Sequence, residues 1–135
     1  MDEFMSRVAL VVDDSMLIRH TVCRFLEERG FTVAVAANGL EALESLKTAR
    51  PNIIITDIKM PKMGGTELIS ALRGNPATAD IPIVVATGRR SRCEKKDYEG
   101  ASFFIFKDID IEKQLANALE QFFGPSSTQG QAAGK

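Results

Sequence analysis

The chain has 135 residues, of which 44% are hydrophobic and 26% charged, a composition typical of a single soluble globular domain and unlike that of a disordered protein. Its 17 Lys and Arg residues nearly balance its 18 Asp and Glu residues, so the basic surplus usual in nucleic-acid-binding proteins is absent. The apolar run at residues 8–12 has only the length of a strand, and we expect a cytoplasmic protein with no signal peptide, membrane span or nucleic-acid partner.

Short apolar runs alternate with helical patterns from this point onward. Residues 8–12 predict a strand covered on both faces. A helical pattern follows, which Gly30 is expected to end, with apolar positions at Ile18, Val22, Phe25 and Leu26. Residues 32–36 predict a second strand because they are β-branched and apolar.

The next two units each place a polar residue at a boundary. Asn38 is expected to cap a second helix, with Glu41 reaching back to it and an apolar face of Leu40, Leu43 and Leu46. Residues 53–56 are the most strand-like run, and Asp57 comes at their carboxyl end. A turn-rich loop then leads to a third helix, whose apolar face comprises Leu68, Ile69 and Leu72.

Two more strands are predicted, residues 82–86 ending at Thr87 and residues 103–106 ending at Lys107. The basic segment between them is poorly patterned, so we expect a short or irregular fourth helix anchored only by Cys93 and Tyr98. The last helix has apolar positions at i, i+4, i+7 and i+11, namely Ile111, Leu115, Ala118 and Phe122. Residues 7–123 thus form the predicted domain, between an N-terminal extension at residues 1–6 and a disordered polar tail at residues 124–135.

Alternating strands and helices imply a parallel sheet with helices on both faces, in which ligands bind outside the carboxyl ends of the strands. Those ends carry three carboxylates, a hydroxyl and an ammonium, from Asp13, Asp14, Asp57, Thr87 and Lys107. Three carboxylates repel one another unless a cation is present, and hard oxygen ligands suit Mg2+. A metal and Lys107 would also neutralise charge on a phosphoryl group moving to Asp57, which would form an aspartyl phosphate.

Five segments together resemble the receiver domain of chemotaxis-regulator-like response regulators in bacterial two-component phosphorelay systems. They are Val-Val-Asp-Asp-Ser at 11–15, Asn-Gly-Leu-Glu-Ala-Leu at 38–43, Thr-Asp-Ile-Lys-Met-Pro-Lys-Met-Gly-Gly at 56–65, Ala-Thr-Gly at 86–88 and Phe-Ile-Phe-Lys at 104–107. The resemblance implies a flavodoxin-like (βα)5 fold, a doubly wound five-stranded parallel sheet of order 2-1-3-4-5.

The resemblance also implies a role for individual residues. Asp57 would be the phosphoacceptor and also a ligand of Mg2+. Asp14 would be a direct Mg2+ ligand, Asp13 would act mostly through a water, and the backbone carbonyl of Lys59 would complete the set; Mn2+ could replace Mg2+. Thr87 and Lys107 would stabilise the phosphoryl group. Thr87 and Phe104 would form the switch, and Gly88 and Arg89 would border the path by which the donor enters.

The implied partners are a sensor histidine kinase or a histidine phosphotransfer protein as the phosphohistidine donor, and a downstream protein target. The receiver would be a monomer or weak dimer. It would catalyse only its own phosphorylation and dephosphorylation, rather than acting as a classical enzyme.

Two departures from the family pattern leave alternatives open. Asp108 stands where the family usually has a proline after a cis bond, so we expect a trans bond there; Asp108 could add a carboxylate near the site or cap the last helix. The basic segment after Thr87 fits either a solvated surface or an altered partner surface. Phe104 fits either a core residue or a switch residue, and His20 is expected at the surface.

Three functions therefore compete. The first is an active single-domain receiver phosphorylated on Asp57. The second is a degenerate receiver that binds a partner constitutively. A purely structural alternative is that Asp13, Asp14 and Ser15 only cap the first helix. The third is a metal-dependent phosphatase of similar fold, disfavoured because Lys59 stands where such enzymes usually have a second aspartate. The sequence is also compatible with a fragment whose tail led to a further domain.

Overall fold

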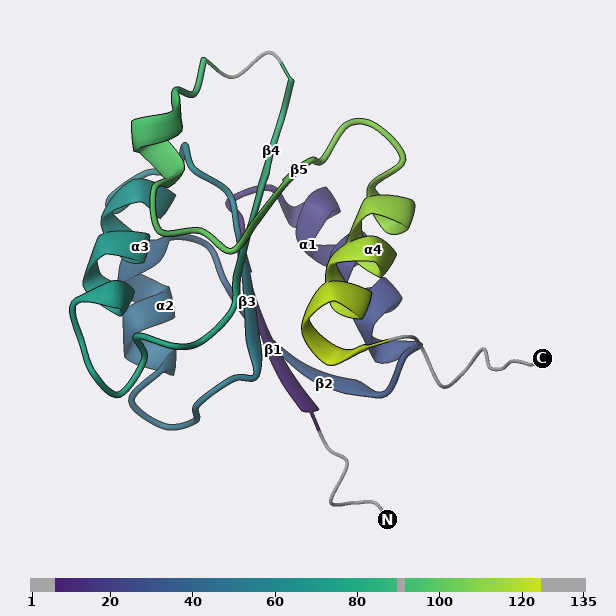
Figure 1. Ribbon diagram of the computed structural model, residues 1–135, viewed down its shortest axis with the longest axis horizontal. Helices are drawn as coiled ribbons and strands as arrows, with labels where there is room; N and C mark the ends of the chain where they lie inside the picture. Colours follow the sequence, from purple (N-terminus) through teal and green to yellow (C-terminus); the bar gives the residue numbers. More distant parts are fainter. Residues whose placement is uncertain (1–6, 90–91, 125–135) are drawn as a thin grey trace.

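The computed structural model describes residues 7–89 and 92–124, which build one twisted sheet between two layers of helices (Figure 1). Five parallel strands pair in the order β2-β1-β3-β4-β5. Their bounds are β1 (Arg7–Val12), β2 (Phe31–Ala36), β3 (Ile53–Thr56), β4 (Ile83–Thr87) and β5 (Phe103–Phe106). This order confirms the doubly wound, flavodoxin-like architecture expected from the sequence.

In the part of the chain that the structure describes, four α-helices and one short 3-10 helix cover the two faces of the sheet. Helices α1 (Met16–Glu27) and α4 (Ile111–Phe123) lie on one face; α2 (Gly39–Ser45), α3 (Gly65–Arg73) and the 3-10 helix η2 (Lys95–Tyr98) lie on the other (Figure 1). None of the helices within residues 7–89 and 92–124 has the length and apolarity needed to cross a bilayer.

Each strand contributes alternate residues to two separate cores, as its period of two requires. On β1, Ala9 and Val11 pack with α1 and α4, whereas Leu10 and Val12 pack on the α2 and α3 side. Every residue of β3 and β4 is buried, which explains their continuous apolar sequences. The carboxyl ends of these two strands and of β1 are therefore anchored from both sides.

The start of α2 differs in part from the sequence prediction. Asn38 caps the helix as predicted, accepting a hydrogen bond from the Glu41 N–H at 3.0 Å. The Glu41 carboxylate, however, accepts from Ala37 N–H at 2.9 Å instead of from Asn38. The prediction that Leu40 lies on the apolar face was wrong, since this residue is 51% exposed.

Gly39 explains why Leu40 points outward. A Cβ at Gly39 would lie 2.6 Å from Cγ of Met63, and the Gly39 N–H donates to the Met63 carbonyl at 2.8 Å. The helix thus presents the bare side of Gly39, together with buried Ala42, to the rest of the protein. Leu40, the next residue, is turned to solvent by the helical rotation.

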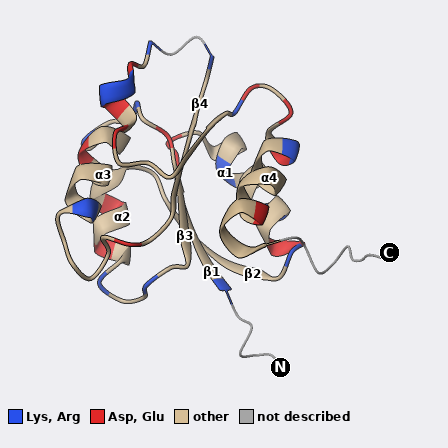
Figure 2. Cartoon of the chain, in the orientation of Figure 1, with Lys and Arg blue, Asp and Glu red and all other residues tan. Residues whose placement is uncertain are grey.

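The segment between β4 and β5 has the short, irregular helix that its sequence predicted. Among its described residues, 88–89 and 92–102, it forms the single 3-10 turn of η2, and Cys93 and Tyr98 are partly buried against the core as expected. Charged residues lie on this turn (Figure 2), and Lys95 and Lys96 are exposed. Residues 90 and 91, the proposed N-terminal extension and tail residues 125–135 lie outside the described residues.

Candidate functional site

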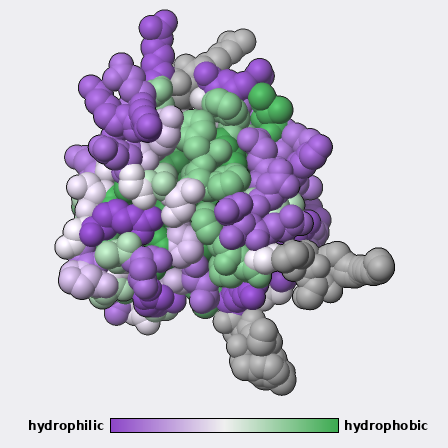
Figure 3. All heavy atoms as spheres, in the orientation of Figure 1, coloured by the Kyte–Doolittle hydropathy of each residue, from purple (hydrophilic) through white to green (hydrophobic). Residues whose placement is uncertain are grey.

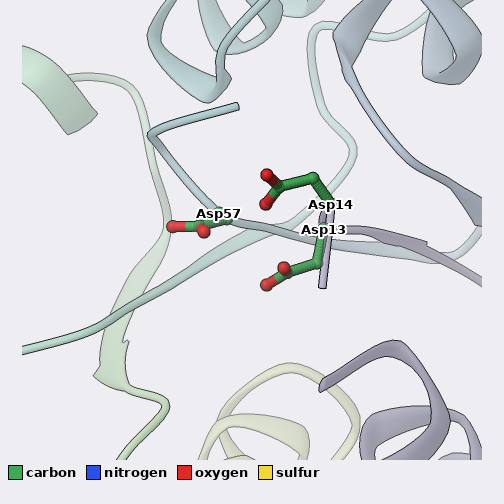
Figure 4. Close-up of side chains that lie close together, drawn as sticks. All are labelled: Asp13, Asp14 and Asp57. Atoms are coloured by element: carbon green, nitrogen blue, oxygen red, sulfur yellow. The ribbon is translucent and has the colours of Figure 1, made fainter. Parts of the chain in front are cut away.

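The candidate site begins where β1 and β3 end side by side. The hydrogen bonding of the sheet continues past both strands, since Asp57 N–H donates to Val12 O of β1 at 3.0 Å and Asp13 N–H donates to Ala36 O of β2 at 3.1 Å. Asp13, Asp14 and Asp57 each place a carboxylate oxygen within 4.8 Å of the others. The side chains of Asp13 and Asp14 extend from the end of β1 toward Asp57 (Figure 4).

Lys107 links the two buried carboxylates of this group. Its Nζ donates to Oδ2 of Asp57 at 2.7 Å and to Oδ2 of Asp13 at 3.0 Å. The side chains of Lys107, Asp13 and Asp57 are 18%, 3% and 7% exposed, so these ion pairs are shielded from water. The turn after β5 therefore delivers a cation to the ends of β1 and β3, across the intervening β4.

The remaining oxygens of these two carboxylates are held by backbone donors. Oδ1 of Asp57 accepts from Ile58 N–H at 2.7 Å, and Oδ1 of Asp13 accepts from Ser15 N–H at 2.8 Å. These bonds and the Lys107 contacts orient both carboxyl planes. Asp14, in contrast, is exposed, so the group is open on that side.

Burial and neighbouring charges act in opposite directions on the pKa of Asp13 and on the pKa of Lys107. Burial raises the pKa of Asp13 above its usual value, and the Ser15 N–H and Lys107 offset this only in part. Burial acts to lower the pKa of Lys107, but its hydrogen bonds to Asp57 and Asp13 and their charges leave that pKa raised.

The donor set fits a divalent cation. With three ionised carboxylates and one ammonium, the group carries a charge of −3 + 1, or −2, which a single divalent ion balances. The three aspartates offer carboxylate oxygens, a ligand type that Mg2+ and Mn2+ prefer. Lys59 lies in the loop two residues after Asp57 with its side chain exposed. The part its carbonyl takes stays a prediction.

Gly65 holds the loop after Asp57 tightly against the strand end, a feature that the sequence analysis did not identify. The Gly65 N–H donates to Ile58 O at 2.8 Å, and a Cβ at residue 65 would overlap the carbonyl oxygen of Asp57. Only glycine fits this approach. The Gly-Gly pair at residues 64–65, which lies in the loop that the sequence predicted to be rich in turns, thus also shapes the candidate site.

Thr87 and Phe104, the two predicted switch residues, lie on neighbouring strands. Thr87 is buried at the end of β4, and its carbonyl accepts from the Lys107 N–H at 3.0 Å. Its Oγ1 lies 4.0 Å from Sγ of Cys93. Phe104 is partly buried, with its ring centroid 4.5 Å from that of Tyr98 and 5.3 Å from that of Phe106. This packing fits the core reading of Phe104, and its switch role stays a prediction.

Asp108 does not cap the last helix. The N-cap position of α4 is Asp110, and no side-chain cap hydrogen bond forms there. The Asp108 carboxylate instead accepts from the backbone N–H of Arg89 at 3.2 and 3.3 Å, and lies 3.6 Å from Nε of Arg89. No peptide bond is cis within residues 7–89 and 92–124, so the Lys107–Asp108 bond is trans as predicted. Asp108 thus joins the turn after Lys107 to the segment after Thr87.

The fold and this site together define a class of protein. The model of the family described as response regulator receiver domain matches residues 9–120, and the chain belongs to that family.

Among its relatives is the response regulator MprA of Mycobacterium ulcerans, 37% identical over 114 residues, a match that covers 83% of this chain and 48% of MprA. The chain thus spans about half the length of the curated relatives it matches. The chemotaxis response regulator CheY4 of Vibrio cholerae has a similar structure, with a TM-score of 0.79, 32% identity and coverage of 88% of this chain and 100% of CheY4. The Mn2+-bound form of response regulator Rcp1 is also similar, with a TM-score of 0.72, 26% identity and coverage of 87% and 94%.

Proposed function

We propose that Asp57 accepts a phosphoryl group from a phosphohistidine donor in a reaction that depends on Mg2+, for which Mn2+ can substitute. The observation that carries this proposal is the contact of Lys107 Nζ with Oδ2 of Asp57 at 2.7 Å, beside two further carboxylates. An oxygen of Asp57 attacks the phosphorus while the phosphorus–nitrogen bond of the donor breaks. The donor imidazole keeps the electron pair of that bond.

Each neighbouring residue has a defined task in this proposal. Asp13, Asp14, Asp57 and the Lys59 carbonyl would hold the metal, which supplies positive charge to the phosphoryl oxygens when bound. Lys107, already paired with Asp57, would stay beside the new phosphoryl group as its counter-charge. The Thr87 hydroxyl would donate to a phosphoryl oxygen, and Gly88 and Arg89 would border the entry path of the donor.

The partners belong to the same proposal. A histidine kinase or a histidine phosphotransfer protein would supply the phosphoryl group, and a protein target would bind the receiver after phosphorylation. Membership in the receiver family supports this assignment. The surface available for such contacts includes apolar area over β5 between the two helical layers (Figure 3), where Phe106 is 37% exposed.

The test is incubation of the protein with acetyl phosphate and Mg2+, followed by intact-mass measurement of the wild type and of Asp57→Asn. The wild type should gain the mass of one phosphoryl group, sensitive to hydroxylamine as an acyl phosphate is, and Asp57→Asn should gain none. EDTA should abolish the reaction. A phosphorylated Asp57→Asn would show that the acceptor is another residue, whereas an unreactive wild type would favour the degenerate receiver that binds its partner constitutively.

A further inference from the structure

One side chain of α4 holds both ends of the turn that carries Lys107. The Nε2 group of Gln114 donates to the Phe106 carbonyl at 2.6 Å, and its Oε1 accepts from the Phe106 N–H at 3.0 Å. The same Nε2 also donates to the carbonyl of Ile109. Both amide hydrogens and the amide oxygen of Gln114 therefore take part in hydrogen bonds. Their partners are Phe106, the residue before Lys107, and Ile109, two positions after it.

The position of Phe106 in the sheet explains why this contact matters. Strand β5 lies at an edge of the sheet, and the Lys107 N–H points inward to Thr87 O at 3.0 Å. Because successive residues of a strand direct their backbone groups to opposite sides, the Phe106 N–H and C=O point outward, away from β4. Gln114 pairs with both of these groups, as one residue of a neighbouring strand would do.

Lys107 is thus fixed at its backbone from two sides. Thr87 holds its N–H from the sheet side, and Gln114 holds the residues around it from the helix side. A lysine side chain has four rotatable bonds, so the backbone from which it starts must be fixed if the Nζ is to stay on two carboxylates. The partly buried Gln114 provides this restraint from the first turn of a long helix.

We propose that Gln114 is a positioning residue, which orients the Lys107 turn so that the ammonium remains in contact with Asp57 and Asp13. The consequence for phosphoryl transfer rests on the proposed function of Asp57, whereas the structural part of the proposal does not. The two parts can be tested separately.

The structural part is tested on the metal-free protein by NMR. Gln114→Leu keeps the side-chain size and removes every hydrogen bond, and exposed Gln121 on the same helix offers the matched control Gln121→Leu. Hydrogen exchange of the Phe106 N–H should become at least about fivefold faster in Gln114→Leu and stay unchanged in the control. The nuclear Overhauser contacts between the Lys107 and Asp57 side chains should weaken only in Gln114→Leu. Unchanged Phe106 exchange, or undiminished contacts, would overturn the proposal.

The functional part is tested by a double-mutant cycle with Lys107→Ala. Gln114→Leu should slow phosphorylation by acetyl phosphate by roughly tenfold or more, because Lys107 is misplaced. In the Lys107→Ala background the same substitution should have little further effect, since the two residues act through one ammonium. Additive losses would mean that Gln114 acts only on general stability, and overturn the proposal.

Gln114→Glu provides a second variant in case Gln114→Leu unfolds. It keeps an acceptor for the Phe106 N–H but places a carboxylate against two carbonyl groups. Exchange at Phe106 should then stay slow while the Lys107 contacts weaken; strong contacts in this variant would contradict a role for the Nε2 bonds. If the wild type itself takes no phosphoryl group, the proposed function fails, and the NMR measurements still decide the positioning role.

Discussion

Lys107 Nζ lies 2.7 Å from Oδ2 of Asp57, so the proposed acceptor oxygen has a cation in contact with it before any donor is bound. This pair is largely shielded from solvent, and the turn that supplies Lys107 is fixed by hydrogen bonds to β4 and α4. The counter-charge is therefore prearranged rather than assembled during the reaction, the arrangement that makes electrostatic stabilisation effective.

Replacing Lys107 should have a large effect on phosphorylation. We expect Lys107→Ala to slow the reaction with acetyl phosphate by about a hundredfold or more, as removal of one preorganised charge stabiliser does in enzymes. The rate can be followed by intact mass over time. Lys113→Ala, an exposed lysine of α4, is the matched control and should react at the wild-type rate. Equal rates for both variants would place the counter-charge elsewhere.

The same lysine should give the metal-free protein a specific alkaline instability. The pKa of Lys107 is raised above its ordinary value of 10.5, so its ion pairs contribute fully below that pH and are lost as the pH rises through the folded-state pKa. Lys107→Met should therefore be less stable than the wild type at neutral pH, and the difference should shrink at alkaline pH. Urea unfolding in EDTA measures this. Lys113→Met should show no such convergence, and a constant difference for Lys107→Met would contradict the pairing.

Asp13, a proposed metal ligand, should reduce the stability of the metal-free protein. Burial raises its pKa above the ordinary 3.8, so its ionised form opposes folding as the pH rises through the folded-state pKa. In EDTA at neutral pH we expect Asp13→Asn to have a melting temperature no lower than that of the wild type. Its affinity for Mg2+ should fall by about tenfold or more. A less stable metal-free variant with normal Mg2+ affinity would be the opposite result.

Gly65→Ala should destabilise the domain and disturb the site, because its methyl group would overlap the Asp57 carbonyl oxygen. We expect the free energy of unfolding to fall by about 2 kcal/mol or more, since the contact is with backbone that cannot move aside easily. Gly74→Ala is the matched control, where the nearest atom to a Cβ is Ser70 O at 3.3 Å. Its loss should stay below about 1 kcal/mol. Similar losses in both variants would argue against the tight loop.

Asp108 should affect donor entry more than stability. Its partner Arg89 and Asp108 itself have side chains 58% and 43% exposed, so Asp108→Ala should change the free energy of unfolding by less than about 1 kcal/mol. Removal of this carboxylate should favour an anionic donor, lowering the acetyl phosphate concentration for half-maximal rate by about twofold at low salt. The gain should vanish at high ionic strength. A gain that is independent of salt would mean that Asp108 acts through loop geometry.

The sequence was sufficient to predict the fold because its signals are local and strong. The all-apolar runs of β3 and β4 reflect burial on both faces, and a parallel sheet brings strand ends to one edge whatever the details of the helices. Asp57 and Lys107 could therefore be placed together from their positions at strand ends alone. Fifty residues separate them in sequence, yet their side chains are in contact.

The errors came from contacts that depend on three-dimensional packing. Leu40 matched a helical pattern, but the contact between Gly39 and Met63 sets the rotation of that helix. For Asp108 the sequence left a capping role open as one of two alternatives, and it could not reveal that the backbone N–H of Arg89 is within reach of this carboxylate. Gln114 gave no signal, because a glutamine on an amphipathic helix usually faces solvent. Such long-range hydrogen bonds leave no periodic trace in a sequence.

The hydrogen bond from the Lys107 N–H to the Thr87 carbonyl has a mechanical consequence. Asp57 is fixed at the end of a fully buried strand, so it has little freedom to move when its charge changes. The segments after Thr87 and around Lys107 lie nearer the sheet edge, and this bond and the Asp108–Arg89 contact fasten them to each other. A displacement of either segment is therefore transmitted to the other, and we expect the two segments to move together during signalling.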